Sequence, residues 1–196
     1  MGPSAERSLQ DAFRALARRD MTGLEALWRE LSGSLHNYAF ALTASQEEAD
    51  DILSEVMLRV ARRGRPLRWV RSPKAYLFGA VRNAVRSRRR REGRRAEADT
   101  FDAPAPEADV TNGAAVRAAV MGLPPEQREV LVLHVWGGLT FGEIGRTVGA
   151  PRNTVASRYR YALGKLRALL GDDADGRGET EAPAGSHEAE HAGRHV

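Results

Sequence analysis

The segment from Pro151 to Leu170 carries basic and short hydrogen-bonding side chains and no acid. Guanidinium groups pair with phosphates and guanine edges, and short amide and hydroxyl groups bind bases and phosphates. The segment therefore favours non-covalent recognition of nucleic acid over catalysis. Its basic and short polar residues are Arg152, Asn153, Thr154, Ser157, Arg158, Arg160, Lys165 and Arg167.

A short capped helix and a tight turn are expected immediately before this segment. Thr140 and Glu143 have the spacing of a capping box, and Gly149 and Ala150 predict a turn before Pro151 starts a longer helix. This order is typical of a helix-turn-helix, whose second helix lies in the major groove of DNA. A helical hairpin with a solvated basic face has the same spacing, so spacing alone leaves both interpretations open.

Residues that could support catalysis or hold a metal are few. The chain has no cysteine, which excludes disulfides, thiolate zinc sites and cysteine nucleophiles. Asp50 and Asp51 are neighbours on an expected helix and do not converge as an acid–base pair. His187, His191 and His195 recur at steps of four, but no apolar residue anchors them. We therefore expect no enzyme activity, no cofactor and no metal.

Charge is distributed unevenly along the chain. Among 30 basic residues only Lys74 and Lys165 are lysine. Residues 96–113 contain acids and no base, and residues 171–196 are also net acidic, so the remaining parts are strongly basic. A general arginine bias would not leave so long a stretch without a base, and the pattern favours a polyanionic partner.

The apolar residues of the first half recur at helical spacing, and no run alternates as a strand would. Ser45 with Glu48 predicts a capping box, and Ser72 with Pro73 predicts another helix start. The latter helix runs into Arg82–Arg95, which holds eight arginines and one acid. We expect its start to face DNA. The apolar stripes are Leu24, Leu27, Trp28, Leu31, Leu35, Tyr38 and Leu42, then Ile52, Leu53, Val56, Met57 and Val60.

The second half is also expected to be helical. Its inward residues are expected to be Val130, Leu131, Leu133 and Val135, then Val155, Tyr159, Ala162, Leu166 and Leu169. The prediction is an all-α protein of two small helical domains joined by a flexible acidic linker. The predicted parts are an N-terminal helical bundle (1–95), the linker (96–113), a helix-turn-helix domain (114–170) and a disordered acidic tail (171–196).

No run of about 20 apolar residues could span a membrane. Residues 1–20 alternate charged and apolar groups and lack the apolar run of a secretory signal. We therefore expect a soluble, cytoplasmic protein without membrane insertion.

Several motifs resemble the extracytoplasmic-function (ECF) sigma factors, small bacterial promoter-specificity subunits of RNA polymerase. The stretches Leu123-Pro-Pro-Glu-Gln-Arg-Glu-Val130, Gly138-Leu-Thr-Phe-Gly-Glu-Ile144 and Asn153-Thr-Val-Ala-Ser-Arg158 resemble sigma region four. The stretches Glu48-Ala-Asp-Asp-Ile-Leu-Ser-Glu-Val56 and Ser72-Pro-Lys-Ala-Tyr-Leu77 resemble region two. The resemblance covers residues 24–170, with the motifs in the order of the family.

The resemblance implies that region four reads the minus-thirty-five promoter element. The implied surface is Arg152, Asn153, Thr154, Ala156, Ser157, Arg158, Arg160 and Tyr161. Ala156 and Tyr161 stand where family members often have basic residues, so the sequence read is expected to differ from well-known cases. Gly145 replaces a usual alanine, which should cost the first helix about 1 kcal/mol.

The resemblance also implies that region two binds and opens the minus-ten element, where the family captures a flipped base. Arginines can hold phosphates there, and aromatic faces can stack on unpaired bases. For the two aromatic residues of this set, a place in the core is the alternative. The implied surface is Arg65, Arg68, Trp69, Arg71, Tyr76, Asn83 and Arg86.

Glu47, Asp51 and Glu55 recur at steps of four on the expected helix Gln46–Arg63, opposite its apolar stripe. In the family this helix docks on a basic coiled coil of the largest polymerase subunit, and acids suit that partner. Ser54 completes the implied docking set, although the family often has glutamine there. A solvated acidic face remains the alternative.

As a whole, the resemblance implies a sigma factor that directs core RNA polymerase to promoters and helps to melt DNA. The implied partners are the polymerase (the coiled coil of its largest subunit and the flap of its second), promoter DNA and an anti-sigma factor. The alternatives are a free-standing, dimeric helix-turn-helix repressor or activator, and a helical adaptor whose arginines only confer solubility.

Overall fold

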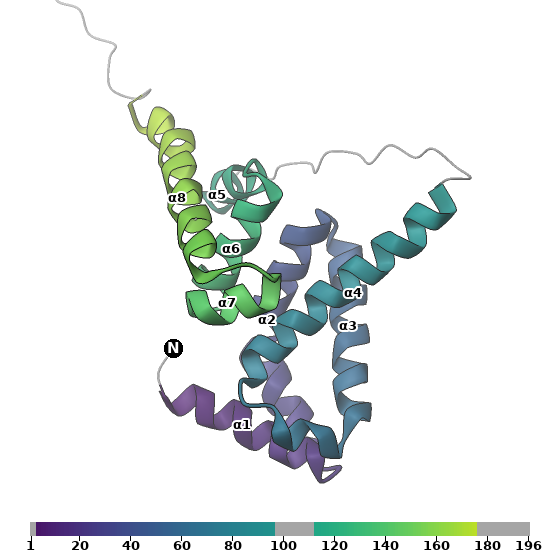
Figure 1. Ribbon diagram of the computed structural model, residues 1–196. Helices are drawn as coiled ribbons and strands as arrows, with labels where there is room; N and C mark the ends of the chain where they lie inside the picture. Colours follow the sequence, from purple (N-terminus) through teal and green to yellow (C-terminus); the bar gives the residue numbers. More distant parts are fainter. Residues whose placement is uncertain (1–2, 97–111, 176–196) are drawn as a thin grey trace, which may run out of the picture.

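A computed structural model of the chain describes residues 3–96 and 112–175, and within these ranges every regular element is a helix (Figure 1). The all-α prediction is therefore confirmed. The first half forms α1 (Pro3–Ala17), α2 (Thr22–Thr43), α3 (Gln46–Arg63), the short 3₁₀ helix η1 (Arg65–Trp69) and α4 (Pro73–Ala96). The second half forms α5 (Asn112–Met121), α6 (Pro125–Val135), α7 (Phe141–Val148) and α8 (Arg152–Asp175).

Helix starts follow the predicted capping residues. The Ser45 hydroxyl accepts a hydrogen bond from the Glu48 backbone N–H at 3.3 Å and opens α3, but the Ser45 N–H donates to Oγ1 of Thr43 rather than to Glu48, so the predicted capping box forms only in part. The Ser72 hydroxyl accepts from the Ala75 N–H at 3.4 Å at the start of α4. α8 continues to Asp175 rather than ending at Leu170 as predicted. The acidic stretch 97–111 and residues 176–196, which include the three spaced histidines, lie outside the described residues.

α1 is a helix that the sequence analysis did not assign. Leu9, Phe13 and Leu16 recur at helical spacing and are completely or almost completely buried against the bundle. Their neighbours are charged, which concealed the stripe within a segment that alternates charged and apolar groups. Because α1 packs on α2 and on η1, it fixes the position of the α3–α4 connection.

The expectation that the apolar stripes face inward is wrong for three of their residues. Trp28, Val135 and Leu169 are 48%, 55% and 49% exposed. Trp28 follows the fully buried Leu27, and one step along a helix turns a side chain by about 100°. Val135 is the last residue of α6, and Leu169 lies on the long α8 well beyond the buried Ala162. Each therefore lies at the margin of its predicted stripe.

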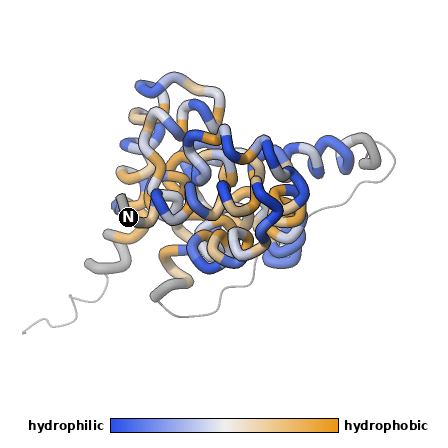
Figure 2. The backbone as a smooth tube through the Cα atoms, turned by 90° about the horizontal axis from the view of Figure 1, so that it is seen from below, coloured by the Kyte–Doolittle hydropathy of each residue, from blue (hydrophilic) through white to orange (hydrophobic). Residues whose placement is uncertain are grey.

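The two halves of the chain pack against each other. α6 packs on α2 and α7 packs on α4, and buried residues of both halves form one continuous core. Figure 2 shows apolar segments gathered toward the middle of the molecule, whereas the projecting end of α4 is hydrophilic. The sequence analysis predicted the two helical bodies but not this contact between them.

A buried polar cluster joins the halves. The Tyr38 hydroxyl donates to Oε1 of Glu129 at 2.8 Å, and Nε of Arg82 donates to the same oxygen at 2.7 Å. The side chains of Arg82 and Glu129 are only 16% and 13% exposed. Burial, and then the charge of Glu129, raise the pKa of Tyr38 well above its ordinary value, so its hydroxyl stays protonated and donates. We call these three residues the Glu129 clasp.

Arg128 adds a second link beside the clasp. One terminal nitrogen donates to the carbonyl of Ala41 on α2 at 3.1 Å, and the other donates to the carbonyl of Leu123 at 3.1 Å. Ser72, at the start of α4, donates to Oε1 of Glu143 on α7 at 2.9 Å. Both contacts of the two halves, α2 with α6 and α4 with α7, therefore carry polar as well as apolar interactions.

Glu129→Ala should lower the free energy of unfolding by about 2 kcal/mol, because it leaves a half-buried guanidinium and a buried hydroxyl without their acceptor. Urea unfolding followed by circular dichroism measures the change. Glu126→Ala is the matched control: its carboxylate is 71% exposed, and the loss of its pair with Arg158 should cost under about 0.5 kcal/mol. Equal effects of the two variants would contradict the clasp.

Candidate nucleic-acid interface

α7 and α8 form the predicted helix-turn-helix. The Thr140 hydroxyl accepts from the Glu143 backbone N–H at 3.3 Å, and Oε2 of Glu143 accepts from the Thr140 N–H at 3.0 Å. The predicted capping box is therefore confirmed. Gly149 ends α7 in the left-handed region, with φ 75°.

Gly145 has a structural role that the sequence analysis missed. A Cβ at this position would lie 2.7 Å from the carbonyl oxygen of Ala150, so the turn approaches α7 more closely than a side chain permits. The same turn donates the Ala150 N–H to the Gly145 carbonyl at 3.0 Å. Gly145 therefore lowers the stability of the helix, as expected, but it also permits a tighter turn between α7 and α8 than alanine would.

An aromatic cluster holds α8 against α6 and α7. The ring centroid of His134 lies 4.8 Å from that of Phe141 and 4.7 Å from that of Tyr159. The centroids of Phe141 and Tyr159 are 5.4 Å apart. Nδ1 of His134 lies 2.9 Å from the Leu139 carbonyl oxygen. These contacts orient the first turns of α8, with Val155 and Ala162 completely buried beneath them.

The residues predicted to read the upstream element lie on the outer side of α8. Arg152, Asn153, Thr154, Arg160 and Tyr161 are exposed, and Ala156, Ser157 and Arg158 are half-buried. Arg158 also donates to Oε2 of Glu126 at 2.8 Å, so its guanidinium already has an acidic partner. The exposed part of the predicted surface is therefore its first turn together with Arg160 and Tyr161.

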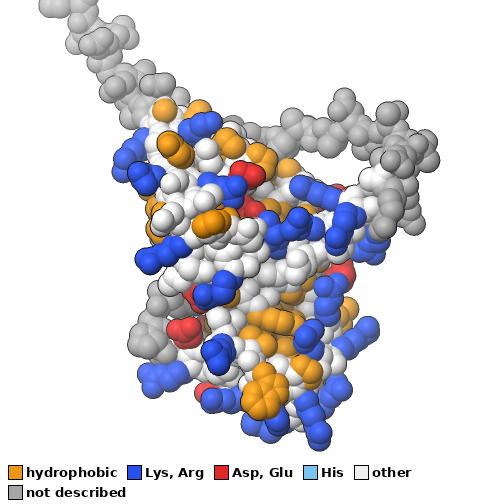
Figure 3. Space-filling model, in the orientation of Figure 1, with side chains coloured by type: hydrophobic (Ala, Val, Ile, Leu, Met, Phe, Trp, Pro, Cys, Tyr) orange, Lys and Arg blue, Asp and Glu red, His pale blue; other side chains and the backbone are white. Residues whose placement is uncertain are grey.

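The residues predicted for the downstream element gather around η1 and the start of α4. Trp69 is 74% exposed, and the Arg68 guanidinium lies 4.5 Å from its ring centroid. Arg65, Arg71, Asn83 and Arg86 are also exposed. Figure 3 shows an apolar patch ringed by basic side chains over the lower end of the molecule, where α1 and the α3–α4 connection lie in Figure 1.

Tyr76 differs from Trp69. It is half-buried, its ring meets Phe13 edge-on at 5.7 Å, and the Arg63 guanidinium lies 5.7 Å from its centroid. Trp69 is 74% exposed although the Arg68 guanidinium lies over its ring, so of the two aromatic residues only Trp69 has the exposure of a stacking platform.

The arginine run of α4 is only partly available. Arg82 belongs to the Glu129 clasp, Arg88 donates to Oδ2 of Asp51 at 3.2 Å, and Arg89 donates to the Leu42 carbonyl. The expectation that the start of the run faces DNA is therefore wrong for Arg82. Helical spacing places this residue near the buried Phe78 and Val81, on the side that meets α6.

The predicted docking acids lie together on α3. Glu47, Asp51, Ser54 and Glu55 are all exposed. Glu55 pairs with Arg59 one turn along the helix, and Asp51 pairs with Arg88 of α4. Glu47 and Ser54 have no such pairing among the described contacts, so the acidic face is partly neutralised from within.

The described ranges, 3–96 and 112–175, hold neither a metal-binding cluster nor a membrane-spanning helix. No cluster of three or more His, Asp or Glu there could hold a metal ion. No helix there is both long and apolar enough to cross a membrane.

Sequence reasoning missed some basic residues near η1. Arg14, in the last turn of α1, and Arg18 and Arg19, just after it, share a cavity with residues at the end of α3 and in η1. The signal was present in the repeated arginines after the Leu9–Leu16 stripe, once this segment is seen as a helix.

Family comparisons match both halves of the chain. Residues 27–95 match the family model described as Sigma-70 region 2, and residues 119–168 match Sigma-70, region 4. A solved structure described as the sigma factor RpoE in complex with the anti-sigma factor NepR, from Bartonella quintana, has a similar fold. Its TM-score is 0.62 at 22% identity, and the match covers 72% of this chain and 92% of that one.

Curated relatives cover most of the chain. The ECF RNA polymerase sigma factor SigM of Mycobacterium tuberculosis is 31% identical over 173 residues, which are 87% of this chain and 88% of that protein. The ECF RNA polymerase sigma factor EcfG of Rhodopseudomonas palustris is 32% identical over 143 residues, which are 70% of this chain and 79% of that protein. The fold and the matched regions define a sigma-70-type protein. More narrowly, the chain belongs to the ECF RNA polymerase sigma factors.

Glu143→Gln should make stability less sensitive to acid. Partial burial acts to raise the pKa of Glu143, but hydrogen bonds from Thr140 and Ser72 outweigh it, so the pKa lies below its ordinary value of 4.5. A lowered pKa in the folded state adds stability that is fully present above pH 4.5 and is lost as the pH falls through the folded value.

Urea unfolding midpoints of wild type and Glu143→Gln, measured from pH 6 to pH 3, test this predicted pH dependence of stability. The stability difference between wild type and Glu143→Gln should be constant at the upper end and shrink on acidification. Ser72→Ala, which keeps the carboxylate but removes one donor, should show part of the same change. A difference that does not vary with pH would exclude the role of the carboxylate charge.

Proposed function

We propose that this chain directs core RNA polymerase to promoters, with α8 reading an upstream element and the η1–α4 surface binding an unpaired downstream element. As an ECF sigma factor the chain is a promoter-specificity factor for RNA polymerase. The single observation that carries the proposal is the match of both sigma regions, in order, to two helical bodies of one chain.

The proposed upstream contact rests on the exposed first turns of α8. Arg152, Asn153 and Thr154 stand at its start, where a recognition helix meets phosphates and base edges. Arg160 lies about two turns further along, is exposed and has no acidic partner among the described contacts. A guanidinium in this situation can pair with the O6 and N7 atoms of guanine.

The proposed downstream contact rests on Trp69. Its side chain is 74% exposed, against 48% and 38% for Trp28 and Trp136, and its ring lies beside the Arg68 guanidinium. Stacking of an unpaired base on an aromatic ring contributes about 1–3 kcal/mol, which helps to offset the cost of opening a duplex. Arg65, Arg68 and Arg71 would neutralise the neighbouring phosphates.

The proposed polymerase contact is the exposed face of α3. Glu47 and Glu55 lie two turns apart on the same side of the helix, away from its buried stripe. In the family this helix meets a basic coiled coil of the largest subunit, and a line of carboxylates complements such a partner. A contact of the helix-turn-helix half with the flap of the second subunit is proposed from the family alone.

Other parts of the proposal follow from this role. The polymerase performs the chemistry, so the chain itself needs no catalytic site, and it acts in the cytoplasm where the polymerase works. An anti-sigma partner is also proposed, since the similar sigma factor RpoE was solved in complex with one.

Run-off transcription with purified core polymerase tests the function. The chain should produce promoter-directed transcripts, and Arg160→Ala should reduce them about tenfold by removing a base contact of about 1–3 kcal/mol, without loss of polymerase binding. Sequencing the promoters selected from a randomised upstream element should show relaxed preference at one position.

Arg29→Ala, an exposed arginine of α2 away from α8, is the control and should match wild type. A dimeric repressor or activator would add no initiation to core polymerase and would bind a palindrome alone. A solubility adaptor would bind no DNA. Either result would exclude the sigma role.

Glu47→Lys/Glu55→Lys should weaken binding to core polymerase about tenfold or more, because it places like charges against a basic partner. Co-purification and surface-plasmon titration measure the affinity. Asp51 is left unchanged so that its pair with Arg88 persists.

The double variant Glu25→Lys/Glu30→Lys on α2 makes the same charge change on an exposed surface elsewhere. It should bind the polymerase like wild type. If both double variants bind equally well, the docking face is wrongly assigned.

A further inference from the structure

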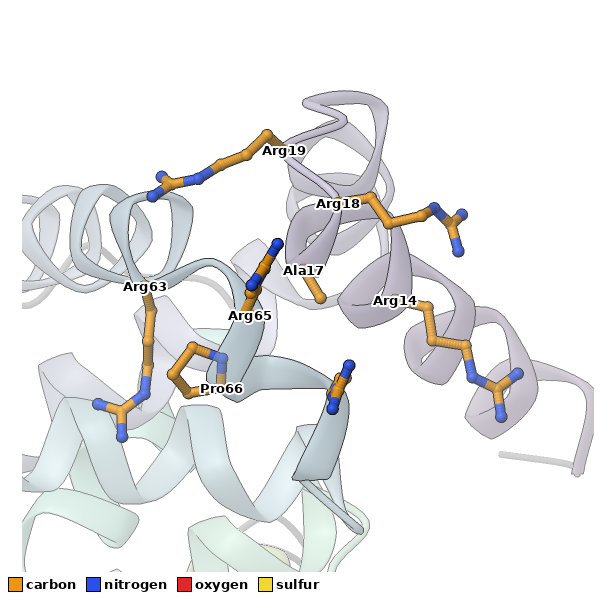
Figure 4. Close-up of a pocket in the computed structure, with 8 residues that line it drawn as sticks. Arg14, Ala17, Arg18, Arg19, Arg63, Arg65 and Pro66 are labelled. Carbon is orange, nitrogen blue, oxygen red and sulfur yellow. The ribbon is translucent and has the colours of Figure 1, made fainter.

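Six arginines line one cavity at the junction of α1, α3 and η1. The cavity has a volume of about 770 Å³, and its other lining residues are only an alanine and a proline. Figure 4 shows Arg65 between η1 and α1, with Arg19 extending toward the end of α3, whereas Arg14 on α1 and Arg18 just after it extend outward on the opposite side. The arginines are Arg14, Arg18, Arg19, Arg63, Arg65 and Arg68.

The backbone places Arg19 in this cavity at an energetic cost. Its φ is 67°, in the left-handed region that favours glycine, which costs a residue with a side chain about 1–2 kcal/mol. Its guanidinium lies over Gly64, where a Cβ would be 3.1 Å from Cζ, and donates to the Arg62 carbonyl at 3.4 Å. This conformation also caps α1, because the Arg19 N–H donates to the Leu16 carbonyl and the Asp20 N–H donates to the Ala15 carbonyl, both at 3.0 Å, as in a Schellman motif.

Little negative charge faces these guanidiniums. Arg14 pairs with Asp11 at 3.0 Å, but both side chains are more than half exposed. Asp20 is adjacent and attracts Arg18, but its Oδ1 accepts from the backbone N–H and the hydroxyl of Thr22 rather than from a guanidinium. No lining residue is acidic, so the cavity concentrates positive charge that an anion would relieve.

The cavity continues into the proposed strand-binding surface. Arg68 is a lining residue, and its guanidinium lies 4.5 Å from the ring centroid of the exposed Trp69. A base stacked on Trp69 would therefore bring its backbone phosphates toward the arginines. Arg14, Arg18 and Arg19 precede residue 27, where the match to region 2 begins.

We propose that this cavity binds closely spaced phosphate groups, and that the unpaired DNA strand next to Trp69 supplies them. The proposal rests on the proposed function for its source of phosphate. Free polyphosphate has the same chemistry and is the other source. The end of α1 thereby becomes part of the surface that holds an opened promoter.

Binding of labelled single-stranded DNA to the full chain, followed by fluorescence anisotropy over a salt series, tests the proposal. Arg18→Gln and Arg19→Gly should each weaken binding about fivefold and reduce the magnitude of the log–log salt slope by about 0.7, the value of one phosphate contact. Arg19→Gly relieves the strained backbone, so its urea stability should not fall and misfolding cannot mimic the result.

Arg29→Gln is the matched control, since it removes one exposed arginine that does not line the cavity. It should leave affinity and slope near wild type. Unchanged binding by both cavity variants would overturn the proposal, as would equal losses in all three variants.

Sodium tripolyphosphate separates the two sources of phosphate. Stoichiometric tripolyphosphate binding that Arg18→Gln abolishes, with DNA binding unaffected, would overturn the strand as the source and assign the cavity to free polyphosphate. Competition between tripolyphosphate and DNA that the cavity variants weaken would support the strand.

Trp69→Ala separates this proposal from the proposed function. If Trp69→Ala loses binding to single-stranded DNA while the arginine variants keep it, the cavity proposal fails and the function stands. If run-off transcription fails but the arginine variants still lose phosphate binding, the function fails and the phosphate site stands.

Discussion

The carboxylate of Glu129 joins two halves of the chain that the sequence separates. A buried carboxylate is tolerated only with a cation and further donors, and here Arg82 and Tyr38, on two different helices, supply them. The clasp holds α6 against α2, and the contact of Ser72 with Glu143 ties α7 to α4. The position of α8 relative to the N-terminal bundle follows from these contacts and the apolar core around them.

Pairing within the fold divides the arginines into two groups. Arg82, Arg88 and Arg128 bind acids or carbonyls within the fold, so their charge is used in packing. Arg65 and Arg160 are exposed and have no acidic partner among the described contacts, so they remain available to bind a polyanion outside the protein. Composition alone cannot tell which arginines belong to which group, because a guanidinium donates the same N–H groups to a carbonyl as to a phosphate.

The proposed DNA surfaces differ in how rigidly they are supported. α8 lies on an aromatic cluster and a capping box, so its exposed side chains project from a fixed helix. Trp69 lies on a short 3₁₀ helix that α1 packs against, and its ring contacts Arg68. Reading a duplex requires fixed geometry, whereas capturing an unpaired base requires an accessible ring and nearby charge, and the two supports suit these tasks.

The sequence by itself determined the long helices after α1, the N-cap at Ser45, the capping box at Thr140, the helix-turn-helix and the family resemblance, because these depend on local spacing. Helical periodicity also predicted the exposure of the acids of α3, whereas the outward position of Arg160 was implied by the family resemblance. The tertiary structure alone decided that Arg82 turns to Glu129, that Tyr76 packs on Phe13 while Trp69 stays exposed, and that α1 brings its arginines to η1. Partners distant in the chain decide each of these outcomes, and periodicity carries no information about which distant face a helix will meet.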